Sequence, residues 1–340
     1  MMETATPRYL LLGKLTRDFV ILPSGKSLLD TPGGNVLYAG VGIRVWDADS
    51  RPGIVARVGE DYPRRWLDLF QRWGLDTRGV HIQPEAVDVR SFIAFSDRNT
   101  LHLDDPVAHF ARLGLPFPKA LLGYRDGSSS LDSRTRLRPI SLRQGDLPPD
   151  FLNASIAHLC PLDFLTHSLM PAALRQAQFS TVTLDPSPGY MNPTYWSDIP
   201  ALLTGLTAFL PSEDEIRRLF QGRSSDLWEM AEALGVYGCD FIVIKRGENG
   251  QWVYDAAAKT RWEIPPYPAR LSNPIGAGDA FCGGFLAGYH RSYDPLEAAL
   301  YGNIASSLAI EGDPPHYPLD ALPGLAQARL EMLRASVRKI

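Results

Sequence analysis

Short apolar runs alternate with longer segments of helical periodicity along most of the chain. The first run lies within residues 8–15, and Asn35, a residue type suited to capping a helix, precedes a mostly apolar helical stretch at 36–46. A second run at 53–59 is followed by a helical pattern that ends at Gly74. This alternation predicts an α/β fold, a three-layer α/β/α sandwich with a mainly parallel sheet.

The same alternation resumes after residue 150. We expect strands at residues 155–162, 181–185, 207–210 and 241–245, with helices at 164–178, 213–221 and 226–235 between them. A β-ribbon is expected at residues 251–254 and 260–264, and helices at 277–289, 295–311 and 319–337. Residues 87–96 also have a strand pattern, whereas residues 97–150 are rich in Pro, Gly, Ser, Asp and Arg, a composition typical of loops and a peripheral element.

Bulk composition narrows the function classes. The 340 residues can bury a substantial core, and a formal net charge of −4 does not favour nucleic acid or an anionic membrane as a partner. Three widely separated cysteines form neither a disulfide framework nor a zinc pattern, so we expect a cytoplasmic location. The N-terminal residues do not resemble a signal peptide, and no apolar run approaches the ~20 residues that span a bilayer.

The strongest chemical signal is Gly276-Ala277-Gly278-Asp279, which follows Pro274 and precedes a helical segment. Small residues allow the backbone to turn sharply into a helix, whose first N–H groups have no internal partner. Such a turn binds phosphate oxygens and can stabilise a phosphoryl-transfer transition state. A carboxylate at the same position, Asp279, can accept a proton from a hydroxyl nucleophile, and we expect the helix dipole to keep it ionised at neutral pH.

The same four residues also fit a purely structural interpretation, a glycine-rich loop capped by a helix-starting aspartate. Two features favour the chemical one. Gly283-Gly284 in the following helix predicts close helix packing, and the segment comes late in the chain after several strand–helix units.

Six segments, in order over about 290 residues, resemble the ribokinase-like (PfkB) family of sugar and nucleoside kinases. They are Gly13 to Asp18, Gly33-Gly34, residues 56–61, residues 211–215, residues 242–250 and Gly276–Asp279, with Asn303 in a helix that resembles the one beside the adenine. The resemblance implies one ribokinase-like domain over residues 1–340, with a small β-sheet lid built from about 14–30 and 86–125.

The resemblance also implies roles for individual residues. Asp18, Gly33, Gly34 and Asn35 would bind the substrate alcohol, and Arg90 of the lid could reach a substrate oxygen or simply be solvated. Lys245, Gly247, Gly250 and Asn303 would contact ATP, and Glu215 would help to organise Mg²⁺. Asp279 would be the catalytic base, with the Gly276, Ala277 and Gly278 amides around the phosphoryl group. A homodimer formed through the lid is also implied.

Four departures from the family pattern affect specific roles. Asn273-Pro274-Ile275 stands where Asp-Thr/Pro-Thr is usual, which puts a monovalent-cation site in doubt. Ser212 replaces the asparagine of Asn-x-x-Glu, and Lys245-Arg246 replaces a common threonine-leucine pair. Tyr38 sits where sugar kinases often have asparagine, so ribose specificity does not follow from the resemblance.

Other motifs have simpler explanations. Gly40-Val41-Gly42 lacks the third glycine of a dinucleotide fingerprint, so helix packing explains it better. His158 and Cys160 have no partner pair at ligand spacing, which favours a core strand over a metal site. Asp185 ends a strand and fits either a pocket lining or a plain turn. The arginines between residues 134 and 143 are better explained as a solvated loop than as an anion site.

Two functions remain open from sequence. The first is an ATP-dependent kinase of a sugar, cyclitol or nucleoside alcohol. The second is a ribokinase-fold protein that binds a small polyol or nucleotide without turnover, a hypothesis motivated by Ser212, Asn273 and Ile275. The intact Asp279 favours the kinase.

Overall fold

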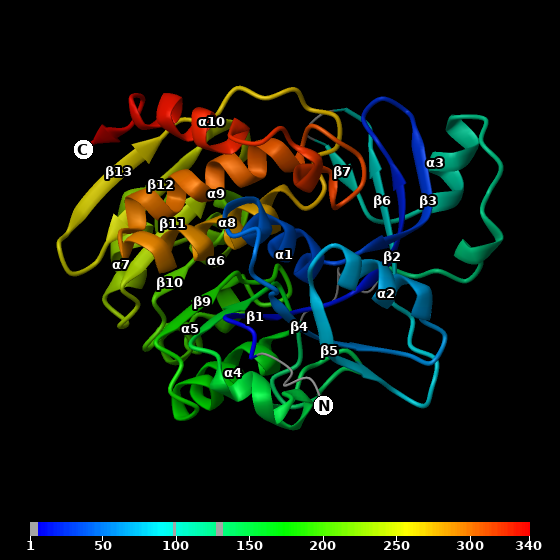
Figure 1. Ribbon diagram of the computed structural model, residues 1–340, viewed down its shortest axis with the longest axis horizontal. Coiled ribbons are helices and arrows are strands. Elements are labelled where there is room, and N and C mark those ends of the chain that lie inside the picture. The colour runs from blue at the N-terminus through cyan, green and yellow to red at the C-terminus, as the bar shows by residue number, and fades with distance from the viewer. Residues whose placement is uncertain (1–5, 98–99, 127–131) are drawn as a thin grey trace.

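A ten-stranded sheet forms the centre of the computed structural model, which describes residues 6–97, 100–126 and 132–340 (Figure 1). The strands are β14 (Arg338–Lys339), β13 (Thr260–Ile264), β12 (Gln251–Asp255), β11 (Phe241–Lys245), β10 (Ala208–Phe209), β9 (Thr181–Leu184), β8 (Ile156–Leu159), β1 (Tyr9–Leu12), β4 (Gly53–Val58) and β5 (Asp76–Ile82), in that spatial order. From β11 to β5 every neighbouring pair is parallel, and β12 to β14 add an antiparallel edge. The predicted mainly parallel sheet is confirmed.

Helices cover both faces of this sheet. They are α1 (Asn35–Trp46), α2 (Arg64–Arg72), α4 (Phe164–Gln176), α5 (Ile199–Leu203), α6 (Glu213–Leu219), α7 (Leu227–Gly235), α8 (Ala277–Ser292), α9 (Pro295–Ala309) and α10 (Leu325–Arg334). Successive residues of β1 point to opposite layers: Leu10 packs in a core with Met170 of α4, whereas Leu11 packs in a core with Leu37 of α1. This is the predicted three-layer arrangement.

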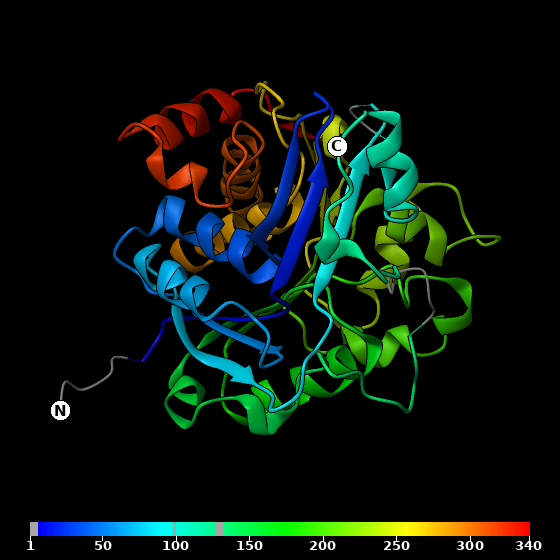
Figure 2. The same cartoon turned by 90° about the vertical axis from the view of Figure 1, so that its right-hand side faces the viewer.

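A separate four-stranded sheet lies beside the main one (Figure 2). It contains β3 (Ser27–Gly33), β2 (Thr16–Ile21), β6 (Arg90–Phe95) and β7 (Leu101–His102), in that order. Its own core centres on Phe19 and Phe92, and Phe110 of α3 (Pro106–Arg112) packs against it. The predicted lid sheet is therefore present; residues 98–99 of the predicted lid lie outside the described residues.

Some predicted boundaries are wrong. Residues 319–337 do not form one long helix, because a 3₁₀ turn at Tyr317–Asp320 is separated from α10 by a break at Pro323-Gly324. Gly324 adopts a left-handed φ of 82°, and proline cannot continue a helix, which explains the break. Strand β5 was not expected, because its polar residues, among them Asp76 and Arg78, mask the strand pattern at an edge position.

Glycines bring α1 and α8 into backbone contact. A Cβ atom on Gly283 would lie 1.9 Å from the carbonyl oxygen of Ala39, and one on Gly42 would lie 2.3 Å from that of Ala280. Any side chain at either glycine would push the helices apart. The packing predicted for these glycines is confirmed, and it fixes the position of the α8 N-terminus.

Across residues 6–97, 100–126 and 132–340, none of the helices has the length and apolar character required to cross a bilayer.

Candidate active site

The turn before α8 has the geometry expected of an anion-binding loop. Gly276 is the N-cap of α8 and adopts a left-handed φ of 75°, a conformation that glycine accepts without steric cost. Ala277, Gly278 and Asp279 form the first turn of the helix, at the positive end of its dipole. The N–H of Ala277 donates to the Pro274 carbonyl at 3.4 Å, and within the described part of the chain the N–H groups of Gly278 and Asp279 have no backbone partner. The four predicted catalytic residues are therefore brought together.

Asp279 carries the free carboxylate of this turn. Among the described residues, none forms a hydrogen bond with its side chain. Burial raises the pKa of Asp279 to about 6, and Glu215 and Asp18 add to the rise, whereas Lys245 and Lys14 oppose it. The surroundings thus raise the pKa, in the direction opposite to that expected from the helix dipole, and at about 6 the carboxyl would be mainly ionised at neutral pH.

A cavity of about 340 Å³ opens on one side of the turn. It is lined by Ala277, Gly278 and Phe281 of α8, and by Pro161, Asp185, Ser212, Glu215, Lys245, Gly247, Gln251 and Ser306. Most of these residues follow the carboxyl ends of parallel strands, where ligands bind in open α/β sheets. We call this space the donor cavity, after the phosphoryl donor ATP that the resemblance assigns to several of its residues. It brings together three of the residues that the sequence assigned to nucleotide and metal: Lys245, Gly247 and Glu215.

Lys245 provides the positive charge of the donor cavity. Its ammonium group is ion-paired with Asp185 and lies 3.7 Å from the sulfur of Cys282. The same nitrogen is 3.6 Å from the position that a Cβ on Gly278 would take. Burial opposes the charge, but Asp185, Cys282 and Glu215 together raise the pKa of Lys245 above its ordinary value. A cation is thus held against the anion-binding turn.

Glu215 occupies the third position of α6 and closes a capping box with Ser212. Its Oε2 accepts hydrogen bonds from the backbone N–H and the hydroxyl of Ser212, at 2.8 and 2.7 Å. Burial, followed by the charge of Asp185, raises the pKa of Glu215 to about 7. Serine therefore performs the capping role at this position, and the glutamate still faces the donor cavity.

A second cavity, of about 290 Å³, lies on the other side of the turn and under the lid. It is lined by Asp18, Val20, Leu28, Thr31 and Pro32 of the lid, by Tyr38, Leu69 and Trp73, and by Asn273, Ile275, Asp313, Pro314, Pro315 and His316. We call it the acceptor cavity. Ile275 lines it one residue before Gly276, while Ala277 and Gly278 line the donor cavity. One short turn thus separates the two cavities.

Asp18 is the buried carboxylate of the acceptor cavity. It accepts a hydrogen bond from the hydroxyl of Thr16 at 2.6 Å, and burial raises its pKa to about 6. Gly33 is required by the same contact, because a Cβ there would lie 1.8 Å from the Asp18 carboxylate. Gly34 has a φ of 117° and caps α1. Gly33 thus lies against Asp18, but neither Gly33 nor Gly34 lines the acceptor cavity, so their substrate contacts stay predictions.

Other predicted site residues have structural partners. The Asn35 side chain accepts from the backbone N–H of Lys14 and donates to the Pro161 carbonyl, both at 2.8 Å, which joins two strand ends. Arg90 is paired with Asp88 and donates to two carbonyls in the lid. Neither Asn35 nor Arg90 lines the acceptor cavity, so their substrate contacts stay predictions.

Asn303 and Gly250, two of the residues expected to contact ATP, also have structural roles within the protein. The Asn303 amide donates to Gln251 at 2.6 Å and to the Pro265 carbonyl at 2.9 Å, and its oxygen accepts from the N–H of Tyr267. It holds the loop after β13 against α9. Gly250 is needed for its φ of 78° and for a close approach to Ile264.

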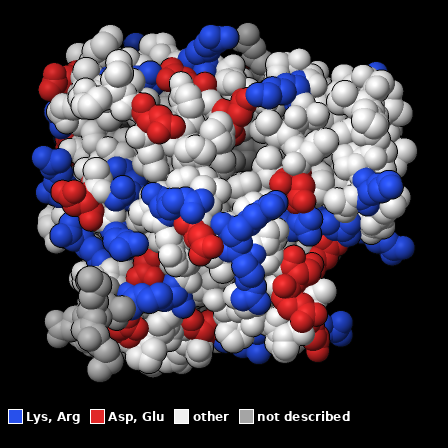
Figure 3. Space-filling model, turned by 45° about the vertical axis from the view of Figure 1, so that its right-hand side comes forward, with Lys and Arg blue, Asp and Glu red and all other residues white. Residues whose placement is uncertain are grey.

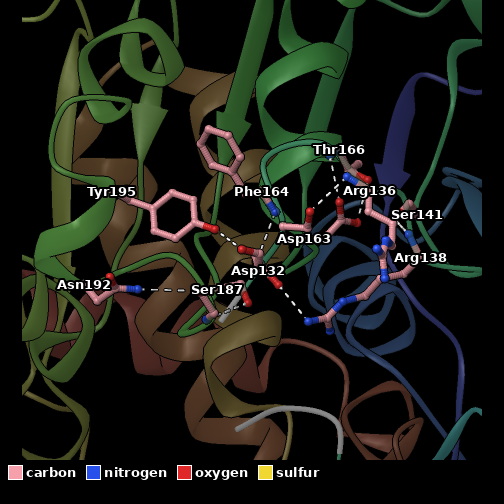
Figure 4. A network of polar contacts seen from close by, with 12 residues as sticks. Asp132, Arg136, Arg138, Ser141, Asp163, Phe164, Thr166, Ser187, Asn192 and Tyr195 are labelled. Carbon is pink, nitrogen blue, oxygen red and sulfur yellow. Dashed lines mark hydrogen bonds and ion pairs between the residues drawn. The ribbon is translucent and has the colours of Figure 1, made fainter. Parts of the chain in front are cut away.

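The arginines near residue 138 anchor their own segment (Figure 4). Arg138 is ion-paired with buried Asp132 at 3.2 Å, and Asp132 also accepts from the N–H of Phe164 at 3.0 Å. Arg134 pairs with Asp198 and lies over the Tyr195 ring. On the face in Figure 3, basic and acidic side chains are interspersed. The arginines therefore hold this loop to the body, in line with the structural interpretation.

Sequence reasoning did not identify Trp73, His316 or Lys14 as site residues. The helical pattern predicts Trp73 as a core residue at the end of a helix. His316 follows a Pro-Pro pair and lies far from any motif. Only the tertiary fold brings both to the acceptor cavity.

The model of the pfkB family carbohydrate kinases matches residues 150–320, half of the chain, including the donor cavity and Asp279. This chain belongs to the pfkB family of carbohydrate kinases.

Comparisons with individual proteins extend over nearly the full length of the chain. A cytidine kinase of Thermococcus kodakarensis is 28% identical over 295 residues, covering 84% of this chain and 89% of the relative. Among solved structures, an Escherichia coli protein assigned as ribokinase II, in complex with ATP and Mg²⁺, has a TM-score of 0.69 at 16% identity, covering 96% of this chain and 99% of the other. Aminoimidazole riboside kinase from Salmonella enterica, bound to aminoimidazole riboside and an ATP analogue, has a TM-score of 0.66 at 18% identity, with 95% and 99% covered. The chain is thus a kinase with the ribokinase fold.

Proposed function

We propose that this kinase moves the γ-phosphoryl group of ATP to a hydroxyl of a small polyol: a sugar, a cyclitol or a nucleoside. The observation that carries the proposal is the single turn between two cavities. Ile275 faces the acceptor side, and Ala277 and Gly278 face the donor side. A hydroxyl and a phosphate placed in these cavities would meet at the N-terminus of α8, beside the Asp279 carboxylate.

In the proposed mechanism, Asp279 takes the proton from the attacking hydroxyl. General base catalysis by a positioned carboxylate contributes typically about 10²–10⁴-fold. The N–H groups of the Gly276–Gly278 turn donate to the transferring phosphoryl group, whose charge is spread over its equatorial oxygens. The ammonium group of Lys245, held 3.6 Å from the Cβ position of Gly278, adds positive charge on the donor side.

Magnesium fits the donor cavity in the manner usual for this ion. Mg²⁺ keeps several waters and is bound by one or two carboxylates together with substrate phosphates. Glu215 faces the cavity with its Oε2 bound to the neutral Ser212, whereas Asp185 is ion-paired through its Oδ2 with Lys245, which offsets its charge. Glu215 would therefore hold the ion, directly or through water. When bound, Mg²⁺ would neutralise phosphate charge.

The lid would exclude water from the acceptor. Lys26, at the tip of the β2–β3 hairpin, is ion-paired with Asp313 on the loop after α9. This contact links the lid to the opposite wall of the acceptor cavity. A closed site protects the donor from hydrolysis. A homodimer through the lid is a further proposal, which sedimentation velocity of the full chain would check.

A coupled ADP-release assay over sugars, inositols and nucleosides tests the proposal, with Asp279→Asn as the control variant. We expect release with at least one alcohol, and a fall of about 10²–10⁴-fold in kcat for Asp279→Asn. If no alcohol gives release above the variant's background, the kinase proposal fails. Measured binding of polyols or nucleotides without release would then favour a binding or sensor protein.

A further inference from the structure

The acceptor cavity has one polar side and a long apolar wall. Asp18 and Thr31 mark the polar side, on the lid. The wall is built from four segments that are distant in sequence: the lid, the end of α2, the residue before Gly276 and the loop after α9. Its side chains are those of Val20, Leu28, Pro32, Leu69, Trp73, Ile275, Pro314 and Pro315.

Several of the polar side chains in this cavity are already engaged. Asp18 accepts from Thr16 at 2.6 Å. The Asn273 amide donates to the carbonyl of Asp313 at 3.0 Å, and the Asp313 carboxylate is ion-paired with Lys26. These groups hold the cavity together, so the wall offers few free partners to hydroxyls placed along it.

An aromatic pair stiffens the wall. The rings of Trp73 and His316 are stacked, with centroids 4.7 Å apart and an interplanar angle of 24°. Trp73 is backed by Phe70, whose ring centroid is 5.3 Å away. The Nδ1 atom of His316 is buried and has no hydrogen-bond partner within the described part of the chain. Because protein atoms cover Nδ1, His316 contributes the flat surface of its ring to the wall rather than a hydrogen bond from that atom.

We infer that the acceptor is a nucleoside, with its sugar hydroxyls at Asp18 and its base against the Trp73–His316 wall. This inference rests on the proposed function of the site. A bare sugar or cyclitol carries hydroxyls around its whole ring, and those facing the wall would lose water without gaining partners. A nucleoside combines a polyol with a planar ring that packs on aromatic side chains such as the Trp73–His316 pair.

Direct binding tests the inference separately from turnover. Isothermal titration of the full chain with cytidine, uridine, adenosine, ribose, myo-inositol and phenyl β-D-riboside needs no ATP. We expect at least one nucleoside to bind 10-fold or more tightly than ribose and myo-inositol. The same ranking is expected for kcat/KM in the ADP-release assay.

The variant His316→Ala separates recognition from folding. We expect the KM for the best nucleoside to rise about 10-fold with little change in kcat, while the KM for ribose stays within twofold. His81→Ala, at an exposed histidine on β5, is the matched control and should change neither value. Trp73→Phe keeps an aromatic ring and should retain most of the nucleoside preference.

Three results would overturn the inference: sugar or cyclitol binding as tight as that of every nucleoside, a preference for the phenyl riboside over all nucleosides, or equal KM changes for ribose and nucleoside in His316→Ala. Tight nucleoside binding without ADP release supports the inference and contradicts the proposed kinase function instead. Failure of the nucleoside inference can therefore be distinguished from failure of the proposed kinase function.

Discussion

The ring of Tyr38 lies directly against Gly276. A Cβ atom on that glycine would be 2.1 Å from the ring, and the glycine also needs its φ of 75°. Tyr38 lines the acceptor cavity, and Gly276 begins the anion-binding turn. The two substrate sides of the enzyme therefore touch through one ring and one α-carbon.

Gly276→Ala should combine two penalties, a steric clash with Tyr38 and a left-handed backbone. The backbone cost alone is about 1–2 kcal/mol. Gly324→Ala is the matched control, because Gly324 has a φ of 82° and open space around its Cβ position. We expect chemical denaturation to show a larger loss of stability for Gly276→Ala, with kcat reduced 100-fold or more. Equal losses in the two variants would contradict the contact with Tyr38.

The pH–rate profile should report the Asp279 carboxylate. Because burial raises its pKa to about 6 and only the deprotonated form accepts a proton, kcat/KM should fall as the pH drops through 6. Asp18 also has a pKa of about 6, so the limb reflects both groups. Asp18→Asn should leave an acidic limb in kcat, whereas Asp279→Asn should abolish it. A flat profile between pH 5 and 8 in the parent enzyme would argue against Asp279 as the base.

Asp279→Asn should make the protein more stable at neutral pH. The folded pKa is raised above the ordinary value, so the native state binds more protons than the unfolded chain between about pH 4 and 6. Ionised Asp279 therefore costs stability that increases as the pH rises through this window and is fully present at pH 7. We expect a Tm a few degrees above the parent at pH 7.5, with the gap closing towards pH 4. A lower Tm at pH 7.5 would contradict this reasoning.

Lys245→Gln should lower both the kcat and the stability of the protein. Removing the ammonium group takes a cation from beside Gly278 and leaves the buried Asp185 carboxylate without its ion-pair partner. Leaving one charge of a buried pair uncompensated typically costs about 3–5 kcal/mol. The double variant Lys245→Gln with Asp185→Asn should recover much of the stability but not the kcat, a pattern that separates catalysis from folding. Full recovery of kcat would assign Lys245 a structural role only.

Asn273 should make the enzyme insensitive to monovalent cations. Its amide donates to the Asp313 carbonyl at 3.0 Å, and its oxygen accepts from the N–H of Ile275, also at 3.0 Å. A neutral amide thus ties the turn to the loop after α9 where the family pattern has a carboxylate. Replacing K⁺ with tetramethylammonium should change kcat less than twofold. Stimulation by K⁺ of tenfold or more would show that cation binding persists without the carboxylate.

Local sequence patterns predicted the layered architecture well. Strand β11 was predicted with the bounds that it has, and α1 and α4 within two residues, because glycine, proline and capping residues mark their ends. Strand β5 was missed because its exposed residues Arg78 and His81 are three positions apart, which breaks the strict alternation that would indicate a strand.

The candidate site was predictable only where it lies in one local segment. Gly276 to Asp279 is a loop–helix junction whose anion-binding geometry follows from the local backbone, so a short motif could indicate it. The stacking of Trp73 on His316 joins residues that are far apart in the chain, at a centroid distance of 4.7 Å, and no local pattern encodes it. Asn35 and Asn303 show the converse: a motif gave each a ligand role, yet backbone groups already occupy their side chains.

The backbone contact between α1 and α8 has a consequence for how such an enzyme can diversify. Gly42 and Gly283 bring together the helices that carry Tyr38 and Asp279, and the close contacts at these two glycines are to backbone atoms of Ala280 and Ala39. Mutations in the apolar residues of the lid and of the loop after α9 can therefore change which alcohol enters while the helix spacing that positions Asp279 stays constant. Most of the acceptor wall and the support of the base lie in different segments, so substrate choice can change while the base keeps its position.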